Sequence, residues 1–303
     1  MKGRGIFRKA VSGFFVGLFI SAFSVPILAQ SELVDRGRYL VEGPANCGNC
    51  HTPKDAQGQP ILERAYSGGF RINLGPPGIV TITNITQDRE TGIGAWTDEE
   101  IIKAIREGRR PDGDILGPPM PIELYRDMAD EDVKAIVAYL RTLKPIRNPV
   151  PRNVYKIPKP TSYGPPVANV SAPPRTDKVK YGAYLFGPIA HCSECHTPME
   201  KGKRLYETRL GAGGFPFLGP WGTIFGANIT PDPETGVGKW TDQQLRDAIT
   251  KGGKPDGSKL IGPMPADWYA KTTSEDLDAI IAYMRTMKPI QNKVEPRLIP
   301  PKN

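Results

Sequence analysis

The sequence lacks several patterns that would place it in a familiar class of protein. It has no glycine-rich fingerprint for a flavin or nucleotide and no paired catalytic groups, so there is no signal for an enzyme built on them. It has no collagen-like period, and its 39% apolar and 8% aromatic residues are too many for a disordered chain. The chain therefore folds, but its 33 glycines and 32 prolines exclude an architecture of long regular helices or sheets.

A nucleic-acid partner is not supported, although the formal net charge is +8. Four of the basic residues lie among the first nine, and no acidic residue occurs in the first 30. Without residues 1–29 the charge falls to +4, and no basic stripe interleaved with aromatic residues remains. The basic balance of the whole chain is thus mostly a property of its first segment.

That first segment has the pattern of a secretory leader. The basic start is followed by an apolar stretch over 10–29, which contains glycine, serine and proline and ends in Ile-Leu-Ala. The pattern predicts a signal peptide over 1–29 that is cleaved after Ala29, which places the mature protein in the periplasm. The alternative is an uncleaved N-terminal membrane anchor, because 20 residues can just span a bilayer.

A long internal repeat organises the rest of the chain. The segment NITQDRETGIGAWTDEE at 84–100 returns as NITPDPETGVGKWTDQQ at 228–244, with 11 of 17 positions identical. A period this long indicates duplicated globular domains, since solenoid units have 20–50 residues. We therefore expect one domain over 31–153, a proline-rich linker over 154–174 and a second domain over 175–303. Proline should make the linker extended and semi-rigid, so that it holds the domains at a set spacing.

Equivalent helices are expected in both copies, with loops between them. They are predicted near 33–41 and 178–186, from Thr97 to Gly108, from Thr241 to Gly252, and around 133–140 and 277–284. Thr273 can cap the last helix of the second copy, whereas Ala129 at the equivalent place cannot, so Asp130 is expected to cap the first. The main strand signal is Ile79 to Ile82. The sequence thus predicts an all-α, loop-rich fold.

All four cysteines and two of the three histidines fall into two identical patterns. These are Cys47-Gly-Asn-Cys50-His51 and Cys192-Ser-Glu-Cys195-His196. Two thiols three residues apart can each form a thioether to a haem vinyl group, and the next residue then presents its imidazole to the iron. The spacing predicts two covalently bound haem c groups, with His51 and His196 as iron ligands.

Two alternatives use the same cysteines differently. A zinc site needs four ligands, so it would have to bridge both domains to use all four cysteines. A thioredoxin-like redox pair or a structural disulfide would not require the following histidine, nor its return 145 residues later. Both alternatives therefore leave part of the pattern unexplained.

The sixth iron position is assigned to methionine in both domains. Met120 and Met264 stand in equivalent loops, LGPPMP at 116–121 and LIGPMP at 260–265. Proline on both sides of each methionine restricts the backbone, as a loop that holds a thioether on iron requires. The other internal methionines are interpreted as packing residues: Met128, Met199, Met284 and Met287.

Some remaining polar and aromatic residues have two interpretations. His191 precedes Cys192 and is expected at the surface or against a haem propionate. The repeated pairs Trp96 with Asn84 and Trp240 with Asn228 could donate to propionates or could serve core packing and loop structure. The two Asn-Ile-Thr segments match the N-glycosylation triplet, but their place in the repeat favours a role in the fold.

These motifs together resemble a known family. The C-x-x-C-H site, the Asn-Ile-Thr segment, Thr-Gly-x-Gly-x-Trp-Thr-Asp, the Met-Pro loop and the final Ala-Tyr-x-Arg-Thr helix are similar to the cytochrome c domains of electron-accepting subunits in periplasmic alcohol and gluconate dehydrogenases. The resemblance implies two tandem class I cytochrome c domains. It also implies that the first and last helices of each domain cross with a glycine against an aromatic residue, Gly37 with Tyr139 and Gly182 with Tyr283. Those subunits often carry three haems, and this chain has two haem motifs.

The expected function is electron transfer rather than enzyme catalysis. We expect a periplasmic dihaem cytochrome c, soluble or loosely membrane-associated, that carries electrons from a dehydrogenase to a terminal oxidase or another cytochrome. The alternative is a dihaem enzyme, either a peroxidase or a thiosulfate-oxidising cytochrome. Such an enzyme needs one iron with an open or unusual sixth position, and the symmetry of the two methionine loops argues against that.

Overall fold

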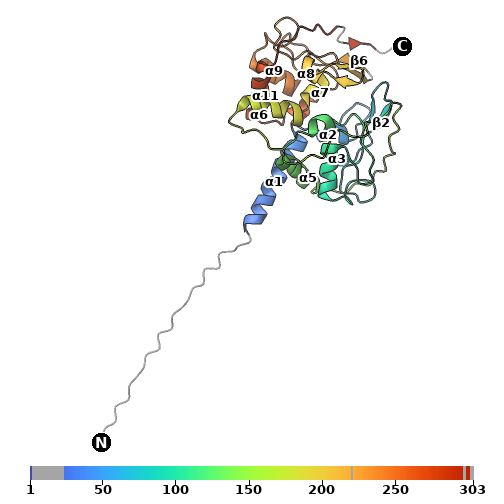
Figure 1. Cartoon of the computed structure of the whole chain (residues 1–303), viewed down its shortest axis with the longest axis vertical. Helices are drawn as coiled ribbons and strands as arrows, with labels where there is room; N and C mark the ends of the chain where they lie inside the picture. The colour runs from blue at the N-terminus through green and yellow to red at the C-terminus, as the bar shows by residue number, and fades with distance from the viewer. Residues whose placement is uncertain (2–23, 220, 296–297, 301–303) are drawn as a thin grey trace.

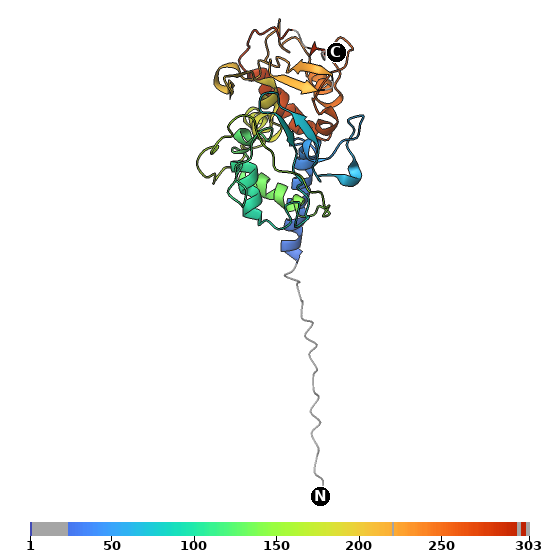
Figure 2. The same cartoon turned by 90° about the vertical axis from the view of Figure 1, so that its right-hand side faces the viewer.

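The structure is a computed structural model that describes residues 1, 24–219, 221–295 and 298–300. The chain forms two lobes that lie against each other (Figure 1). Helices α1 to α5 belong to one lobe and helices α6 to α11 to the other, and the view turned by 90° shows the same division (Figure 2). The two copies of the sequence repeat therefore fold as two separate units.

The first lobe is mainly helix and loop. It contains α1 (Ser24–Glu42), α2 (Cys47–His51), the 3₁₀ turn η1 (Leu62–Arg64), β1 (Arg71–Asn73), β2 (Ile79–Thr81), α3 (Asp98–Glu107), α4 (Ile122–Tyr125) and α5 (Asp130–Leu140). Strands β1 and β2 form a short antiparallel hairpin, which accounts for the predicted strand.

The second lobe repeats this order with a few more strands. It contains α6 (Lys178–Tyr184), the π-helical turn η2 (Leu185–Ile189), α7 (Cys192–His196), β3 (Met199–Glu200), β4 (Lys203–Arg204), α8 (Tyr206–Arg209), β5 (Pro216–Gly219), β6 (Gly222–Phe225), α9 (Asp242–Lys251), α10 (Ala266–Tyr269), α11 (Ser274–Thr286) and β7 (Leu298–Ile299). All strand pairs are antiparallel and short. The helical, loop-rich fold class is confirmed.

The predicted signals for the central helices are present in both lobes. Thr97 forms a complete capping box with Glu100 at the start of α3, and α9 begins in the same way at Thr241. The two helices end at Gly108 and Gly252, whose φ angles of 66° and 62° lie in the left-handed region that glycine adopts without strain. Local sequence therefore determined both ends of these helices.

The prediction that Asp130 caps α5 is wrong. No side chain caps this helix from within its own turn, and Ala129 is the N-cap residue. The Asp130 carboxylate instead accepts hydrogen bonds from Arg106 and from the backbone N–H groups of Asn169 and Val170. Because the Asp130 carboxylate is held by Arg106 and by the backbone of residues 169–170, it cannot also accept a hydrogen bond from the first turn of α5.

The first and last helices of each lobe cross at the predicted glycines. A methyl group at Gly37 would overlap the backbone carbonyl of Ala135 and the side chain of Tyr139, and Gly182 has the same relation to Ala279 and Tyr283. Only glycine allows the two helix backbones to approach so closely. This crossing, implied by the family resemblance, is confirmed in both lobes.

The repeated asparagines organise loops rather than face solvent. The Asn84 amide donates to Thr91 Oγ1 at 3.1 Å and to the Ile146 carbonyl at 2.8 Å, while its oxygen accepts from Thr86. Asn228 makes the equivalent bonds in the second lobe. Both asparagines are buried, so the role in the fold that was favoured over glycosylation is supported by their contacts.

The two lobes are joined by a reciprocal pair of hydrogen-bond clusters. The Tyr39 hydroxyl on α1 donates to the Asp276 carboxylate on α11 at 2.6 Å and accepts from the backbone of Thr273, the N-cap residue of α11. Tyr184 on α6 donates to Asp132 on α5 at 2.6 Å and accepts from the N-cap residue Ala129. Each lobe thus caps the last helix of the other.

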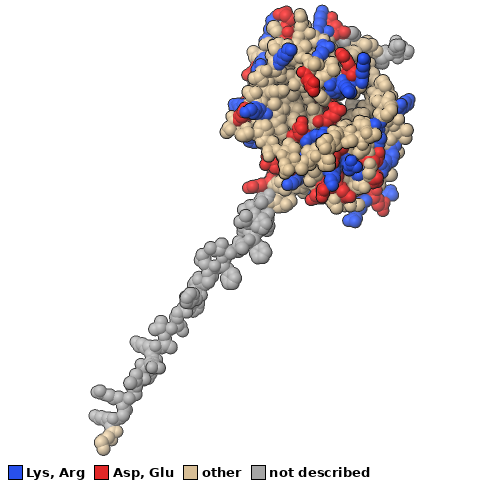
Figure 3. All heavy atoms as spheres, in the orientation of Figure 1, with Lys and Arg blue, Asp and Glu red and all other residues tan. Residues whose placement is uncertain are grey.

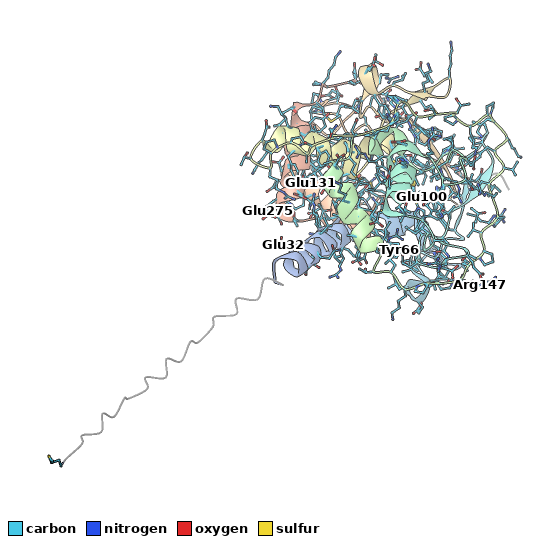
Figure 4. The ribbon with its side chains drawn as sticks, turned by 60° about the horizontal axis from the view of Figure 1, so that its bottom comes forward. Glu32, Tyr66, Glu100, Glu131, Arg147 and Glu275 are labelled. Atoms are coloured by element: carbon cyan, nitrogen blue, oxygen red, sulfur yellow. The ribbon has the colours of Figure 1, made fainter. Side chains whose placement is uncertain are left out.

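The buried aspartates of this interface are charge-compensated. Asp132 accepts two hydrogen bonds from Arg36, at 2.8 and 3.0 Å, and Asp276 accepts one from Arg175 at 3.0 Å. The exposed Glu32, Glu131 and Glu275, on α1, α5 and α11, mark this end of the molecule (Figure 4). A buried carboxylate needs its arginine and tyrosine partners in place, which favours a fixed arrangement of the lobes.

Replacing Tyr39 by phenylalanine should weaken the protein and change its alkaline behaviour. The lost hydrogen bond to a carboxylate costs about 2 kcal/mol in the free energy of unfolding at pH 8. Burial and the Asp276 carboxylate raise the pKa of the Tyr39 hydroxyl above its usual value of about 10. The stability from this shift is therefore complete below about pH 10 and is lost as the pH rises through the folded-state pKa. The variant should lose stability less steeply above pH 10.

Denaturant unfolding at pH 8 and pH 11 measures both effects. Tyr184→Phe should behave in the same way, because burial and Asp132 raise its pKa too. Variants that unfold like the parent chain at pH 8 would show that the reciprocal bonds add nothing to stability.

The predicted leader lies largely outside the described residues. Helix α1 begins at Ser24 and continues through Ala29, the residue before the predicted cleavage point. Among the described helices, none has the length and apolar character needed to cross a membrane.

Candidate haem sites

Each C-x-x-C-H motif forms one short helix that begins after a sharp turn. Asn46 precedes α2 with φ 38°, and His191 precedes α7 with φ 41°. Both residues lie in the left-handed region, which asparagine tolerates better than most residues. The turn places the two cysteines and the histidine of each motif on a single helical turn, as attachment of one haem requires.

The motif histidines are held by backbone carbonyls. His51 Nδ1 lies 2.9 Å from the Thr83 carbonyl oxygen, and His196 Nδ1 lies 2.8 Å from that of Ala227. Because a carbonyl only accepts, Nδ1 carries the proton, and Nε2 is the ring nitrogen with the lone pair that can bind iron. Burial lowers the pKa of His51, which keeps its imidazole neutral.

The cysteine side chains are half-buried free thiols with low acidity. Burial raises the pKa of Cys47 and of Cys192 to about 12 and that of Cys50 to about 11. Redox-active C-x-x-C pairs show the opposite shift, because they depend on an accessible thiolate. The thioredoxin-like alternative is therefore not supported by the environment of these residues.

A zinc site is also not supported by the described residues. Within residues 24–219, 221–295 and 298–300, no three His, Cys, Asp or Glu side chains come together as a set of metal ligands. A zinc ion held by protein side chains alone needs four such groups.

The methionine loops lead into helices that reach the cysteines. The backbone N–H of Ile122 at the start of α4 donates to the Met120 carbonyl at 2.9 Å. At the end of α4, burial and the nearby Cys47 thiol raise the pKa of Tyr125 well above its usual range. The structure therefore brings the Met120 loop and the first haem motif to the same region, with Met120 partly buried against the core.

The second lobe has the same arrangement. The N–H of Ala266 at the start of α10 donates to the Met264 carbonyl at 3.0 Å. Tyr269 at the end of α10 is fully buried, and burial and the nearby Cys192 and Cys195 thiols raise its pKa well above the usual range. Met264 is partly buried like Met120.

The two haem motifs face each other across the interface between the lobes. A methyl group at Gly48, inside the first motif, would overlap the ring of Trp268 from α10 of the second lobe. Asn46 Nδ2 lies 3.4 Å from His191 Nε2, so the residues that precede the two motifs are also in contact. Sequence comparison gave no signal for Trp268, because the equivalent residue in the first copy is Leu124.

His191 lies in the contact between the lobes rather than freely at the surface, and its predicted contact with a haem propionate stays a prediction. Its side chain is 15% exposed, and its ring makes an edge contact with Tyr125 at a centroid distance of 6.0 Å. Burial lowers the pKa of His191 to about 4, so the imidazole is neutral at physiological pH. His191 therefore contributes to the contact between the lobes.

Three of the other methionines are packing residues, as expected. Met128, Met284 and Met287 are buried. Met199 is 42% exposed, so its interpretation as a packing residue is wrong.

Arg110 is a candidate site residue that the sequence did not reveal. Its guanidinium lies over the Trp96 ring at 5.1 Å from the centroid. Its Nε atom is buried without a hydrogen-bond partner in the described part of the chain, and the carboxylate oxygen of Asp112 is 3.7 Å away. An unpartnered guanidinium N–H beside Trp96, a predicted propionate partner, is suited to bind an anionic group such as a haem propionate. Together with the cysteines and histidine of the motif, Arg110 therefore fits a haem site.

Each of the two helical lobes carries two free cysteine thiols and a histidine hydrogen-bonded to a carbonyl on one helical turn. This arrangement defines a protein built to hold two covalently attached haems. A family profile for cytochrome c matches residues 34–144 and 179–288, once in each lobe. The chain belongs to the cytochrome c family, and its two domains each take one covalent haem c. The matched ranges fall within the predicted domains.

Curated relatives fit this assignment. The chain is 34% identical over 279 residues to the fructose dehydrogenase cytochrome subunit of Gluconobacter japonicus, covering 86% of this chain and 54% of the relative. It is 31% identical over 284 residues to the cytochrome c subunit of a quinone alcohol dehydrogenase from Gluconacetobacter polyoxogenes, covering 86% and 57%. A dihaem c-type cytochrome of Cereibacter sphaeroides is 29% identical over 259 residues, covering 81% and 83%. The chain thus spans about half the length of the two dehydrogenase subunits.

Proposed function

We propose that this chain is the electron-carrying dihaem cytochrome subunit of a periplasmic dehydrogenase and that it passes electrons to a terminal oxidase or another cytochrome. The observation that carries the proposal is the pair of C-x-x-C-H helices that face each other across a hydrogen-bonded interface. The similarity to cytochrome subunits of fructose and alcohol dehydrogenases supports the choice of donor.

The proposal assigns each haem one set of residues. Cys47 and Cys50 form the thioethers in the first domain, with His51 and Met120 as iron ligands. In the second domain these are Cys192 and Cys195, with His196 and Met264. When bound, each haem supplies one iron that accepts and releases a single electron, and methionine as the second axial ligand raises its potential.

The protein's own residues hold this arrangement still. The carbonyls of Thr83 and Ala227 orient the two imidazoles, because a hydrogen bond to the ring nitrogen that does not bind the metal fixes the orientation of the ring. Buried Tyr125 and Tyr269 lie near the cysteine thiols of the first and second domain and pack against this side of each site. The reciprocal bonds of Tyr39 and Tyr184 keep the two domains in one relative position. A site that changes little between oxidation states is what rapid electron transfer requires.

The predicted leader supports a periplasmic location, and the surface charges bear on how a redox partner would dock. The predicted leader over 1–29 directs the chain to the periplasm, where it would be cleaved or would remain as an anchor to the membrane. On the face shown in Figure 3, basic and acidic side chains are interspersed, with no large area of one sign. A partner that docks on this face would therefore depend on local complementarity rather than on overall charge.

An electron-relay experiment tests the proposal. The purified holoprotein should not be reduced by fructose or an alcohol alone. It should be reduced when a catalytic fructose or alcohol dehydrogenase subunit, stripped of its own cytochrome, is added, and it should then accept two electrons per chain. The same chain without haem is the matched control. Direct turnover of the organic substrate or rapid consumption of peroxide by the isolated protein would contradict the proposal and favour an enzyme.

A further inference from the structure

The two methionine loops differ in what lies against them. The interdomain segment, defined here as residues 151–172, has no helix or strand and runs over the first lobe. It crosses the first methionine loop, residues 116–121. The two loops share four of six residues, and they differ at Gly117 and Pro118, which are Ile261 and Gly262 in the second loop. The contact with the interdomain segment makes their surroundings unequal as well.

Two tyrosines of the interdomain segment donate to carbonyls of the first loop. The Tyr155 hydroxyl donates to the Pro118 carbonyl at 2.8 Å, and the Tyr163 hydroxyl donates to the Leu116 carbonyl at 3.0 Å. Met120 lies two residues beyond the first of these bonds. The loop backbone is thus held from outside at two points just before the methionine.

The tyrosine rings also pack closely on the loop and its base. A methyl group at Gly117 would come within 2.6 Å of Tyr155 Cζ, and one at Gly108 within 2.9 Å of Tyr163 Cε2. The two glycines therefore provide the space in which the rings lie. Gly108 also ends α3, so Tyr163 contacts both the helix end and the loop that pairs with it.

The interdomain segment is itself anchored on both sides of Tyr155. Asn153 makes two hydrogen bonds with the backbone of Thr81, at 2.7 and 3.0 Å. Lys159 donates to the Asp114 carboxylate at 2.6 Å and to the Ile115 carbonyl at 2.7 Å. A tyrosine on an anchored segment restrains the loop, whereas one on a free segment would only follow it.

The second loop has no equivalent support in the described residues. For carbonyls 260–263, the described part of the chain contains no side chain from outside the loop that donates a hydrogen bond. Ile261 is 63% exposed, and the close contact of Gly262 is with the apolar side chain of Ile224. The backbone before Met264 therefore depends on its own proline residues and on apolar packing.

We propose that Tyr155 and Tyr163 are positioning residues for Met120 and that they make this ligand harder to displace from its iron than Met264. The inference rests on the proposed function, in which both methionines are iron ligands. A loop held by two external hydrogen bonds must break them, or carry the segment with it, before its methionine leaves. The interdomain segment then makes the two haem sites differ, although each belongs to one copy of the same repeat.

Imidazole titration of the oxidised full-length holoprotein tests the inference, since imidazole replaces a displaced methionine. The parent chain should show two affinities, with the weaker one in the first domain. In the double variant Tyr155→Phe, Tyr163→Phe, only this weaker affinity should rise, by about tenfold, which corresponds to about 1.4 kcal/mol and is typical of one to two neutral hydrogen bonds. Ser162→Ala is the matched control, because it removes hydrogen bonds that the segment makes only to itself, with Gly164, and that reach neither the loop nor an anchor on the first lobe.

The methionine methyl signals in the NMR spectrum of the reduced protein provide a second readout. The two signals shifted by haem are assigned by their loss in Met120→Ala and Met264→Ala. Only the Met120 signal should move in the double variant. Unchanged affinities, an equal rise at both haems, or the same rise in Ser162→Ala would overturn the inference while the two signals of the parent chain still supported the proposed ligands. A parent chain without these signals would overturn the ligand assignment and the inference together.

Discussion

Met264→Ala should convert one of the two haems from six-coordinate, low-spin iron to high-spin iron with an open position, and Met120→Ala should do the same to the other. No other methionine stands in an equivalent loop, so nothing nearby replaces the lost thioether. The reduced variants should bind carbon monoxide at one haem, and the oxidised variants should gain weak peroxidase activity, because an open iron can bind peroxide. Electron paramagnetic resonance of the oxidised protein counts the high-spin centres.

The reduction potential of the affected haem should fall by on the order of 100 mV or more, since axial ligands tune haem potentials over about 0.8 V. Met199→Ala is the matched control, because Met199 is exposed and belongs to neither loop. A parent protein that already contains a high-spin haem would contradict the ligand assignment and would favour the dihaem enzymes as the better class.

The features that the sequence predicted correctly are those that each depend on a short segment. The helices that open at Thr97 and Thr241 are determined by residues within one turn, and the haem motifs by five consecutive residues. The crossing of Gly37 with Tyr139 joins distant segments, and it was reached through the family resemblance. Repetition strengthened these predictions, because a functional pattern that occurs twice is harder to attribute to chance.

The interface between the lobes could not be predicted in this way. Comparing the copies shows which residues are equivalent, such as Tyr39 and Tyr184, but contacts across the interface join residues that are not equivalent, such as Tyr39 and Asp276. His191 does contact its equivalent position, but the sequence does not indicate that contact either. Its neighbour in the structure is its own counterpart Asn46, and no property of either residue in the sequence indicates that the two meet.

The interdomain segment shows a similar limit. Its prolines predicted a chain without regular structure of its own, and the segment contains no helix or strand. Its contacts with the first lobe depend on single side chains, such as Tyr163 and Asn153, that carry no local signal. The wrong prediction for Asp130 has the same origin, because backbone N–H groups of this segment donate hydrogen bonds to its carboxylate.

Replacing both cysteines of one motif should remove one haem and leave the other. In the double variant Cys47→Ser, Cys50→Ser, no thiol remains in the first domain to form a thioether, while the second motif is intact. The haem absorbance per chain should fall by half. Cys192→Ser with Cys195→Ser is the matched variant in the second domain, and it should give the same loss.

The mass of the denatured, intact protein tests the central claim most directly, because only covalent haem survives denaturation. The account predicts a parent chain that begins near Gln30 and carries the added mass of two haems, and variants of either motif that carry one. A parent chain without added haem, or a motif variant that still carries two, would contradict a dihaem cytochrome c built on these four cysteines.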